Sequence, residues 1–176
     1  CKPGDVVLIN GTIGDHGIAI MSARKGIELS TDVVSDTCSL RAMMLDLFTQ
    51  VPEIHVLRDP TRGGLVSSLN EIAQRSGTGI TLVESALPIH EGVEGACEIM
   101  GYDPLYIANE GKILVILPEQ FAPVALSIMQ SHTEGAASRI IGRVGSSHPG
   151  ILQLETVIGT TRIVDMISGE QLPRIC

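Results

Sequence analysis

The feature that most constrains the fold is the run Ile113-Leu114-Val115-Ile116-Leu117, in which every residue is apolar. Successive side chains of a strand point to opposite faces of a sheet, so this run would be apolar on both faces. Strands of that kind lie inside sheets that are covered on both sides. The run therefore predicts a central strand over 112–117, in a sheet against which helices pack.

Further strands and helices are predicted on either side of this run. Short β-branched or apolar runs predict strands over 5–10, 54–57, 80–83, 105–108, 139–144, 151–155 and 160–164. Helical spacing of apolar residues predicts helices over 15–24, 40–50, 64–76 and 91–100, and a further helix that Pro118 opens at its first turn. Strands and helices alternate loosely, so the fold class is α/β or α+β, with helices packed on a mixed sheet.

Two helices have apolar stripes that define their expected buried faces. The first stripe is Leu40, Met43, Met44, Leu47 and Phe48, and the second is Phe121, Val124, Ala125, Ile128 and Met129. Cys97 lies on a similar stripe over 91–100 and is expected in the core.

Length and charge narrow the function classes. A chain of 176 residues is long enough for one compact domain with a continuous core. The net charge of −8 argues against general affinity for nucleic acid, which depends on clustered Lys and Arg. The sequence contains no run of about eighteen apolar residues, so no membrane helix is expected.

The cysteines and the ends of the chain add three expectations. Cys1, Cys38, Cys97 and Cys176 show no paired spacing, which predicts free thiols in a reducing cytoplasm and neither a disulfide framework nor a zinc site. The chain begins with Cys1 rather than Met, so an N-terminal part is expected to be missing, although an absent initiator Met would look the same. The last residues carry no periodicity. They divide the chain into a domain over 1–166 and a mobile tail over 167–176.

The tail ends in a candidate carrier thiol, Cys176. A cysteine at the end of a flexible segment can be delivered to a site elsewhere. Arg174 would favour its thiolate, whereas the terminal carboxylate would oppose it. The alternative is an exposed terminal cysteine without a role.

A candidate general base lies between two apolar runs, in Asn109-Glu110-Gly111-Lys112. The Glu110 carboxylate at such a turn would be partly withdrawn from water, as a general base often is. The alternative is an ordinary turn, because Asn and Gly are common turn residues.

A candidate anion site lies in Asp59-Pro60-Thr61-Arg62-Gly63-Gly64, at a strand end and a helix start. Paired glycines let backbone N–H groups converge, and the helix dipole and Arg62 add positive character, so phosphate could bind there. Gly-Gly before a helix is nevertheless common, and the segment is not a P-loop.

A candidate titratable side chain is His16 in Gly14-Asp15-His16-Gly17, where Asp15 can cap the following helix. A histidine in such a loop is more often a loop contact than a catalyst. The remaining histidines share no spacing, so no metal cluster is predicted.

The order of these segments resembles the hydrogenase expression/formation protein family HypE. The three internal motifs are shared, in looser form, by aminoimidazole ribonucleotide synthetase, selenophosphate synthetase and thiamine monophosphate kinase. The terminal Pro173-Arg174-Ile175-Cys176 separates HypE from those relatives. The resemblance covers the whole chain, matches only the second domain of that two-domain family, and implies an aminoimidazole ribonucleotide synthetase C-terminal-domain-like fold.

The resemblance implies a carbamoyl dehydratase, a lyase that needs ATP. The carbamoyltransferase HypF loads a carbamoyl group onto Cys176, ATP activates its oxygen, and Glu110 removes protons from its nitrogen. Asn109, Lys112, Arg62, Gly63, Gly64 and His16 would support the site or bind phosphate. The resulting thiocyanate would donate its cyano group to iron held by the HypC–HypD complex during nickel–iron hydrogenase maturation.

The resemblance also implies what this chain lacks. The family binds ATP with Mg²⁺ mainly through its N-terminal domain, which also builds most of a homodimer, so this fragment alone is expected to be inactive. No metal is expected in this domain, and neither nucleic acid nor membrane is expected as a partner.

Two other functions remain open from the sequence. One is an ATP-dependent synthetase or kinase in purine, selenium or thiamine metabolism, in which Cys176 would be incidental. The other is a non-catalytic docking module whose tail is only a recognition peptide.

Overall fold

The computed structural model describes residues 1–25 and 33–166. Within these ranges, seven strands form one sheet in the order β2-β4-β1-β5-β3-β6-β7. Strands β3 and β6 pair in parallel and the other neighbours pair antiparallel, so the sheet is mixed, as predicted. The strands are β1 (Asp5–Ile9), β2 (Val56–Arg58), β3 (Gly79–Val83), β4 (Leu114–Pro118), β5 (Arg139–Gly145), β6 (Leu152–Glu155) and β7 (Thr161–Ile163).

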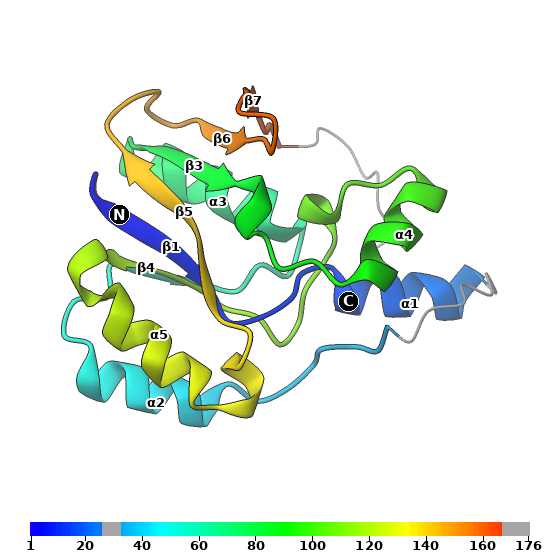
Figure 1. Ribbon diagram of the computed structural model, residues 1–176, viewed down its shortest axis with the longest axis horizontal. Helices are drawn as coiled ribbons and strands as arrows, with labels where there is room; N and C mark the ends of the chain where they lie inside the picture. The colour runs from blue at the N-terminus through cyan, green and yellow to red at the C-terminus, as the bar shows by residue number, and fades with distance from the viewer. Residues whose placement is uncertain (26–32, 167–176) are drawn as a thin grey trace.

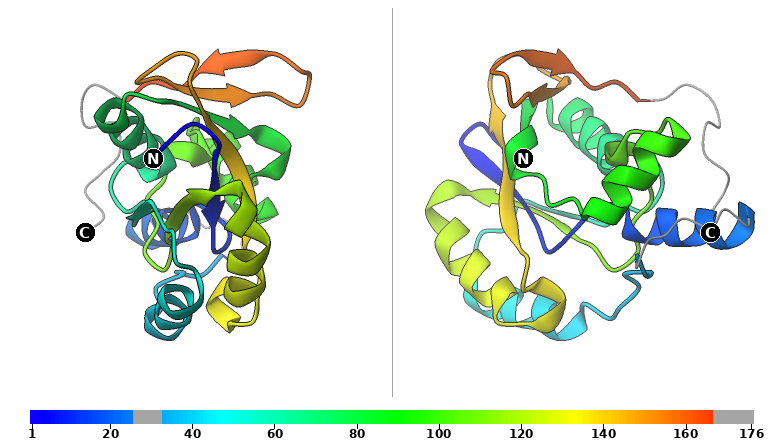
Figure 2. Two further views of the ribbon diagram at one scale, coloured as in Figure 1. Left: turned by 90° about the vertical axis from the view of Figure 1, so that its left-hand side faces the viewer. Right: turned by 45° about the vertical axis from the view of Figure 1, so that its right-hand side comes forward.

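Helices cover both faces of this sheet (Figure 1). Helix α3 packs on one face, and α2 and α5 pack together on the other. Helices α1 and α4 lie beside each other at one end of the sheet (Figure 2). The helices are α1 (Asp15–Lys25), α2 (Arg41–Gln50), α3 (Gly64–Ser76), α4 (Glu91–Met100) and α5 (Ala122–Gln130), and short 3-10 turns are η1 (Glu84–Ala86), η2 (Pro104–Tyr106), η3 (Glu119–Phe121) and η4 (Thr133–Gly135).

Strand β4 shows why the apolar run required a covered sheet. Leu114 and Ile116 belong to the core on the α3 side, whereas Val115 and Leu117 belong to the core under α2 and α5. The strand is hydrogen-bonded to β1 on one side and to β2 on the other. Its apolar side chains are therefore buried on both faces, and the prediction of an interior strand is confirmed.

A third, smaller core lies between α1 and α4. Ile18 and Met21 of α1 contact a cluster that includes Val93 and Cys97 of α4. Cys97 is buried, as predicted, and desolvation raises the pKa of its thiol to about 11. Cys97 is thus a core residue and not a nucleophile at neutral pH.

Two predicted elements are wrong. Residues 105–108 are not a strand, because Pro104 starts the 3-10 turn η2 and the Asp103 carboxylate accepts a hydrogen bond from the backbone N of Leu105 at 3.0 Å. Pro118 ends β4 and caps the 3-10 turn η3, and helix α5 begins only at Ala122, with Pro123 in its first turn. In both places a local turn precedes or replaces the regular element that the apolar pattern indicated.

Two residues of the predicted apolar stripes are exposed. Phe48 on α2 and Val124 on α5 have exposed fractions of 60% and 48%. The other stripe residues Met43, Leu47 and Met129 are buried in the core that α2 and α5 share. The buried stripe of each helix is narrower than helical spacing alone indicates.

The remaining expectations concern cysteines, membranes and the tail. Cys1, Cys38 and Cys97 are free thiols. Within the described ranges, no helix is long and apolar enough to span a membrane. The predicted tail over 167–176, with Arg174 and Cys176, lies outside the described residues.

Candidate functional site

Three of the predicted motifs meet because of the register of three neighbouring strands. Leu114, at the start of β4, pairs with Ile9 at the end of β1 and with Arg58 at the end of β2. The segment that follows β1, the segment that follows β2 and the turn that precedes β4 therefore lie at one end of the sheet. These segments contain Gly14 to Gly17, Asp59 to Gly64, and Asn109 to Lys112.

The side chain of Asn109 joins these three segments. Its Oδ1 accepts a hydrogen bond from the backbone N of Gly14 at 2.8 Å. Its Nδ2 donates to the carbonyl oxygens of Pro60 at 3.1 Å and Ile107 at 3.0 Å. The Asn109 side chain is buried, so these hydrogen bonds are protected from water. Asn109 is therefore the structural centre of the candidate site.

Glu110 follows directly in the turn over 109–112, which we call the base turn. Glu110 is half-buried, whereas Asn109 before it and Gly111 after it are buried. The Asn10 side chain holds the turn, because its Nδ2 donates to the Gly111 carbonyl oxygen at 3.0 Å and its Oδ1 accepts from the backbone N of Ile113 at 2.8 Å. The fold thus presents the candidate base on a backbone that is fixed from the end of β1.

Lys112 ends the base turn in a buried ion pair. Its Nζ lies 2.8 Å from Oδ2 of Asp36, and the two side chains are only 8% and 7% exposed. Sequence reasoning missed Asp36, which lies 76 positions before Lys112 in a segment without periodicity. The one available signal was the lysine itself, because a buried ammonium group requires an anionic partner.

The segment over 33–39, which we call the strap, connects two of the motifs. Cys38 Sγ donates to the Gly111 carbonyl oxygen at 3.8 Å, and Ser35 Oγ lies 2.9 Å from Nδ1 of His16. His16 is half-buried and makes this loop contact at the start of α1. The strap therefore lies between the base turn and the loop that carries His16.

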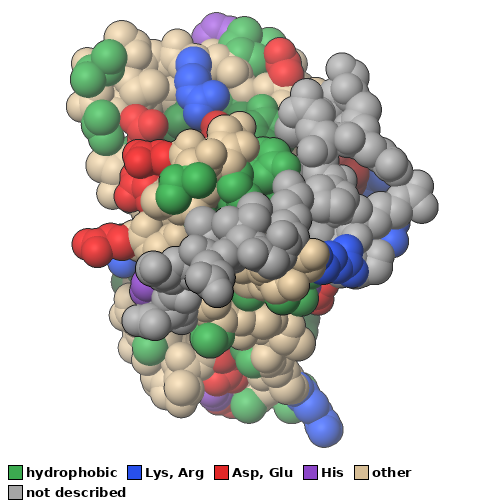
Figure 3. Space-filling view, turned by 90° about the vertical axis from the view of Figure 1, so that its right-hand side faces the viewer, with side chains coloured by type: hydrophobic (Ala, Val, Ile, Leu, Met, Phe, Trp, Pro, Cys, Tyr) green, Lys and Arg blue, Asp and Glu red, His purple; other side chains and the backbone are tan. Residues whose placement is uncertain are grey.

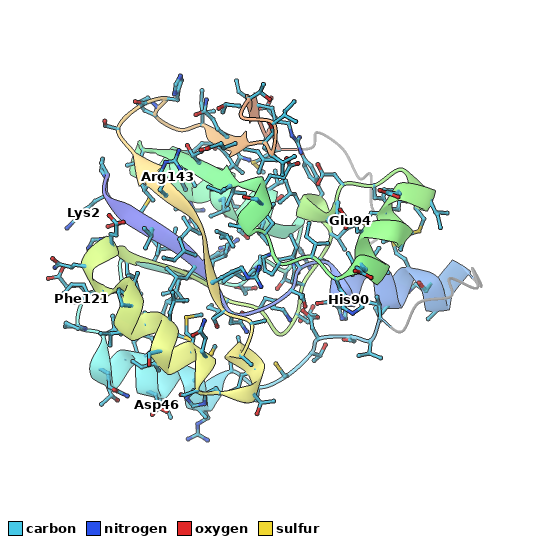
Figure 4. All side chains as sticks on the ribbon, viewed as in Figure 1. Lys2, Asp46, His90, Glu94, Phe121 and Arg143 are labelled. Atoms are coloured by element: carbon cyan, nitrogen blue, oxygen red, sulfur yellow. The ribbon has the colours of Figure 1, made fainter. Side chains whose placement is uncertain are left out.

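Asp15 places a second buried carboxylate near this ion pair. Desolvation raises the pKa of Asp15 above 3.8, and the nearby Asp36 carboxylate acts in the same direction. The hydrogen bond from the Thr12 hydroxyl and the positive charge of Lys112 lower the pKa but do not cancel the effect of burial. His90, at the N-terminus of α4, lies at the same end of the molecule as α1 (Figure 4). Its electrostatic effect also lowers the pKa of Asp15.

The glycines before α3 pack closely against the neighbouring turn. Gly64 has φ +61, and a Cβ there would lie 2.5 Å from the carbonyl oxygen of Leu105 and 2.7 Å from that of Ile107. Gly63 also has a positive φ and precedes the first residue of α3, whereas Arg62 is exposed. Gly64 therefore has a packing role beside the predicted role of these residues in anion binding, which stays a prediction.

The predicted site is separate from a cleft elsewhere on the described surface. A cleft of about 340 Å³ lies between β2 and α3. No predicted site residue lines it; its walls are formed by Cys1, Val56, Leu57, Arg58, Glu71, Ile72, Arg75 and Ser76. Within the described ranges, no group of three or more His, Cys, Asp or Glu side chains could hold a metal ion.

The face at the α1 and α4 end of the molecule carries charges of both signs. Figure 3 shows Lys and Arg side chains scattered over the described part of this face, not gathered in one basic patch. Acidic and apolar side chains lie among the basic ones.

Comparison with known proteins adds evidence from whole sequences and folds. The family model described as "AIR synthase related protein, C-terminal domain" matches residues 2–155. The carbamoyl dehydratase HypE of Rhodobacter capsulatus is 49% identical over 175 residues, covering 99% of this chain and 52% of the relative.

Two solved structures have nearly the same fold. A crystal structure of the hydrogenase maturation protein HypE in complex with ATP matches with a TM-score of 0.95 and 44% identity, over 100% of this chain and 54% of that one. A crystal structure of a HypE–HypF complex matches with a TM-score of 0.90 and 48% identity, over 95% and 54%. The chain thus spans about half the length of the proteins that it matches.

Proposed function

This chain belongs to the AIR synthase related protein, C-terminal domain family, and from that premise we propose that it is one half of an ATP-dependent carbamoyl dehydratase. The observation that carries the proposal is the convergence of three motifs on the Asn109 side chain, directly beside Glu110. The identity of 49% to a carbamoyl dehydratase, over 99% of this chain, supports the assignment of the reaction.

The proposed substrate is a carbamoyl group carried as a thioester-like adduct on Cys176. Its oxygen is a poor leaving group, so ATP first transfers its γ-phosphoryl group to this oxygen, and the nitrogen gives up one proton to water as a C=N bond forms. Glu110 then removes the second proton while the C–O bond breaks and phosphate leaves. The products are a thiocyanate on Cys176, ADP and phosphate.

The residues around Glu110 have supporting roles in this proposal. Asn109 and Lys112 hold the base turn at its two ends, through the hydrogen bonds and the ion pair described above. His16 belongs to the same motif as Gly14, whose backbone N–H donates a hydrogen bond to the Asn109 side chain. Arg62, Gly63 and Gly64 precede α3, where backbone N–H groups and the positive end of the helix dipole would favour a phosphate oxygen.

The other half of the protein would supply most of the ATP site, with its Mg²⁺, and most of a homodimer interface. A HypE protein has been crystallised with ATP, and another with HypF, which supports ATP as a ligand and HypF as a partner; we assign HypF as the source of the carbamoyl group. The cyano group would then pass to iron held by the HypC–HypD complex for a nickel–iron hydrogenase. A carrier thiol must stay reduced, so we place this reaction in the cytoplasm.

Intact-mass spectrometry tests the proposal. The full-length protein is incubated with HypF, carbamoyl phosphate and ATP, and Cys176→Ala is the control. We expect a carbamoyl adduct on the terminal peptide that loses one water when ATP is available to the dehydratase. The absence of any adduct with a demonstrably active HypF would contradict the proposal and favour a synthetase or kinase of the same fold.

A further inference from the structure

We propose that Asp36 is a positioning residue for Glu110, because it holds the base turn in place from the strap through Lys112. This inference rests on the proposed function, in which Glu110 is the general base. Asp36 would not touch the substrate. It would act by fixing the direction from which the Glu110 carboxylate approaches the nitrogen.

The ion pair anchors the turn close to the base. Lys112 lies two positions after Glu110, and its Nζ contacts Asp36 Oδ2 at 2.8 Å in a setting where both side chains are over nine-tenths buried. The Coulomb attraction within a buried ion pair is stronger than within an exposed one, because water does not screen it. The end of the base turn is therefore held by a charge on a different segment of the chain.

The strap also touches the turn through its backbone. A Cβ at Gly111 would lie 1.9 Å from the carbonyl oxygen of Asp36 and 2.7 Å from Sγ of Cys38. Only glycine lets the two backbones approach this closely. Asp36 thus contacts the residue next to Glu110 with its backbone and the residue after that with its carboxylate.

The hydrogen bonding of Asp36 argues against a role in stability alone. Its Oδ1 is buried and has no hydrogen-bond partner among the described residues. A buried ion pair stabilises a fold only when further hydrogen bonds satisfy its remaining lone pairs, because desolvation of both charges opposes it. A pair of this kind beside Asp15, a second buried carboxylate, adds little net stability, but its 2.8 Å contact still fixes where Lys112 Nζ lies.

The experiment measures single-turnover dehydration in the full-length protein. Each variant is first carbamoylated by HypF, and the loss of water after ATP addition is followed by intact mass. In Asp36→Asn the shape is kept but the charge on Lys112 loses its partner. We expect the rate constant to fall roughly 10- to 100-fold, with the ATP concentration for half-maximal rate unchanged, because a misplacement of about 1 Å has effects of that size.

Two further variants separate positioning from folding. Asp5→Asn is the matched control, because Asp5 is also a buried carboxylate, 2.7 Å from Nδ1 of His55, but lies at the opposite end of β1, near Lys2 (Figure 4). It should lower thermal stability without changing the rate constant. In a Glu110→Gln background, Asp36→Asn should cause no further loss, since there is no base left to position.

The outcomes divide clearly. Three outcomes would overturn the positioning role alone. In the first, Asp36→Asn lowers the rate constant by the same factor with and without Glu110→Gln; in the second, Asp5→Asn lowers it as much as Asp36→Asn does. In the third, Asp36→Asn has the wild-type rate constant although Glu110→Gln is impaired. An unchanged rate in Glu110→Gln, or no dehydration by the wild type, would overturn the proposed function itself. If Asp36→Asn does not fold, Lys112→Arg replaces it, because the bulkier cation must shift the turn, and the same non-additivity with Glu110→Gln is expected.

Discussion

The side-chain oxygen of Asn109 accepts a hydrogen bond from the backbone nitrogen of Gly14 at 2.8 Å, across 95 positions of sequence. We therefore expect Asn109→Ala to separate the loop before α1 from the base turn. The substitution leaves the Gly14 N–H and the Pro60 carbonyl without partners in a buried setting, so the free energy of unfolding should fall by about 2–4 kcal/mol. Urea denaturation followed by circular dichroism measures this loss. Asn70→Ala, which removes another buried side-chain amide whose partners are the carbonyl oxygens of Val66 and Val164, shows how much of this loss is specific to the site.

Glu110→Gln should slow dehydration strongly and leave folding intact. Glutamine has the same shape but cannot accept a proton, so the ATP-dependent loss of water should slow roughly 10²- to 10⁴-fold. Carbamoylation of Cys176 by HypF should continue, because it does not need this base. Intact mass separates the two steps, and a melting temperature equal to that of the wild type excludes a folding defect. Normal dehydration in this variant would remove Glu110 from the mechanism.

Asp15→Asn should stabilise the chain more at pH 7 than near pH 4. The raised pKa of Asp15 means that the folded state holds the proton more tightly than the unfolded state does. The resulting stability is present below 3.8 and is lost as the pH rises through the folded pKa. Asparagine imitates the protonated form at every pH. Unfolding free energies of both proteins between pH 4 and 7 test this, and a difference that shrinks with rising pH would contradict it.

Cys176→Ser distinguishes a carrier thiol from a docking peptide. The hydroxyl is a much weaker nucleophile, so the variant should lose carbamoylation and hydrogenase maturation, while binding to the HypC–HypD complex persists. Maturation assays and pull-down of the complex are the two measurements. Full maturation by this variant would favour the docking module, and full activity after removal of the last four residues would favour a synthetase or kinase.

The chain of 176 residues alone should neither hydrolyse ATP nor dehydrate a carbamoyl thiol. It spans about half of its relatives' length, and the proposed ATP site lies mainly in the other half. Phosphate release and intact mass, with the full-length protein as positive control, test this expectation. Measurable turnover by the chain alone would place the nucleotide site within it.

The sequence predicted the elements in which the apolar residues follow a simple pattern that matches their burial. Helix α3 occupies the predicted range Gly64–Ser76, and β4 was recognised because all of its side chains had to be covered. Errors arose where a local turn competed with an apolar pattern, as at Pro104 and Pro118. Phe48 is exposed because burial depends on which side chains pack against α2, and no local pattern records those neighbours.

The candidate site was predicted in part. The motifs around Gly14, Gly64 and Asn109 were recognised separately, and the structure brings them together. Asp36 was missed because a long-range ion pair leaves no spacing in the sequence. Cys176 stays a prediction, since it lies outside the described residues.

The pairing of Leu114 with both Ile9 and Arg58 has a consequence for how this domain can vary. An insertion of one residue within β1, β2 or β4 would displace one loop by about 3.3 Å relative to the other two and turn its side chains to the opposite face. The Asn109 side chain bonds to Gly14 N at 2.8 Å and to the Pro60 carbonyl oxygen at 3.1 Å, so a shift of that size would break these hydrogen bonds. Insertions are therefore tolerable at the end of these strands that is far from Asn109, where a longer chain does not separate the three loops.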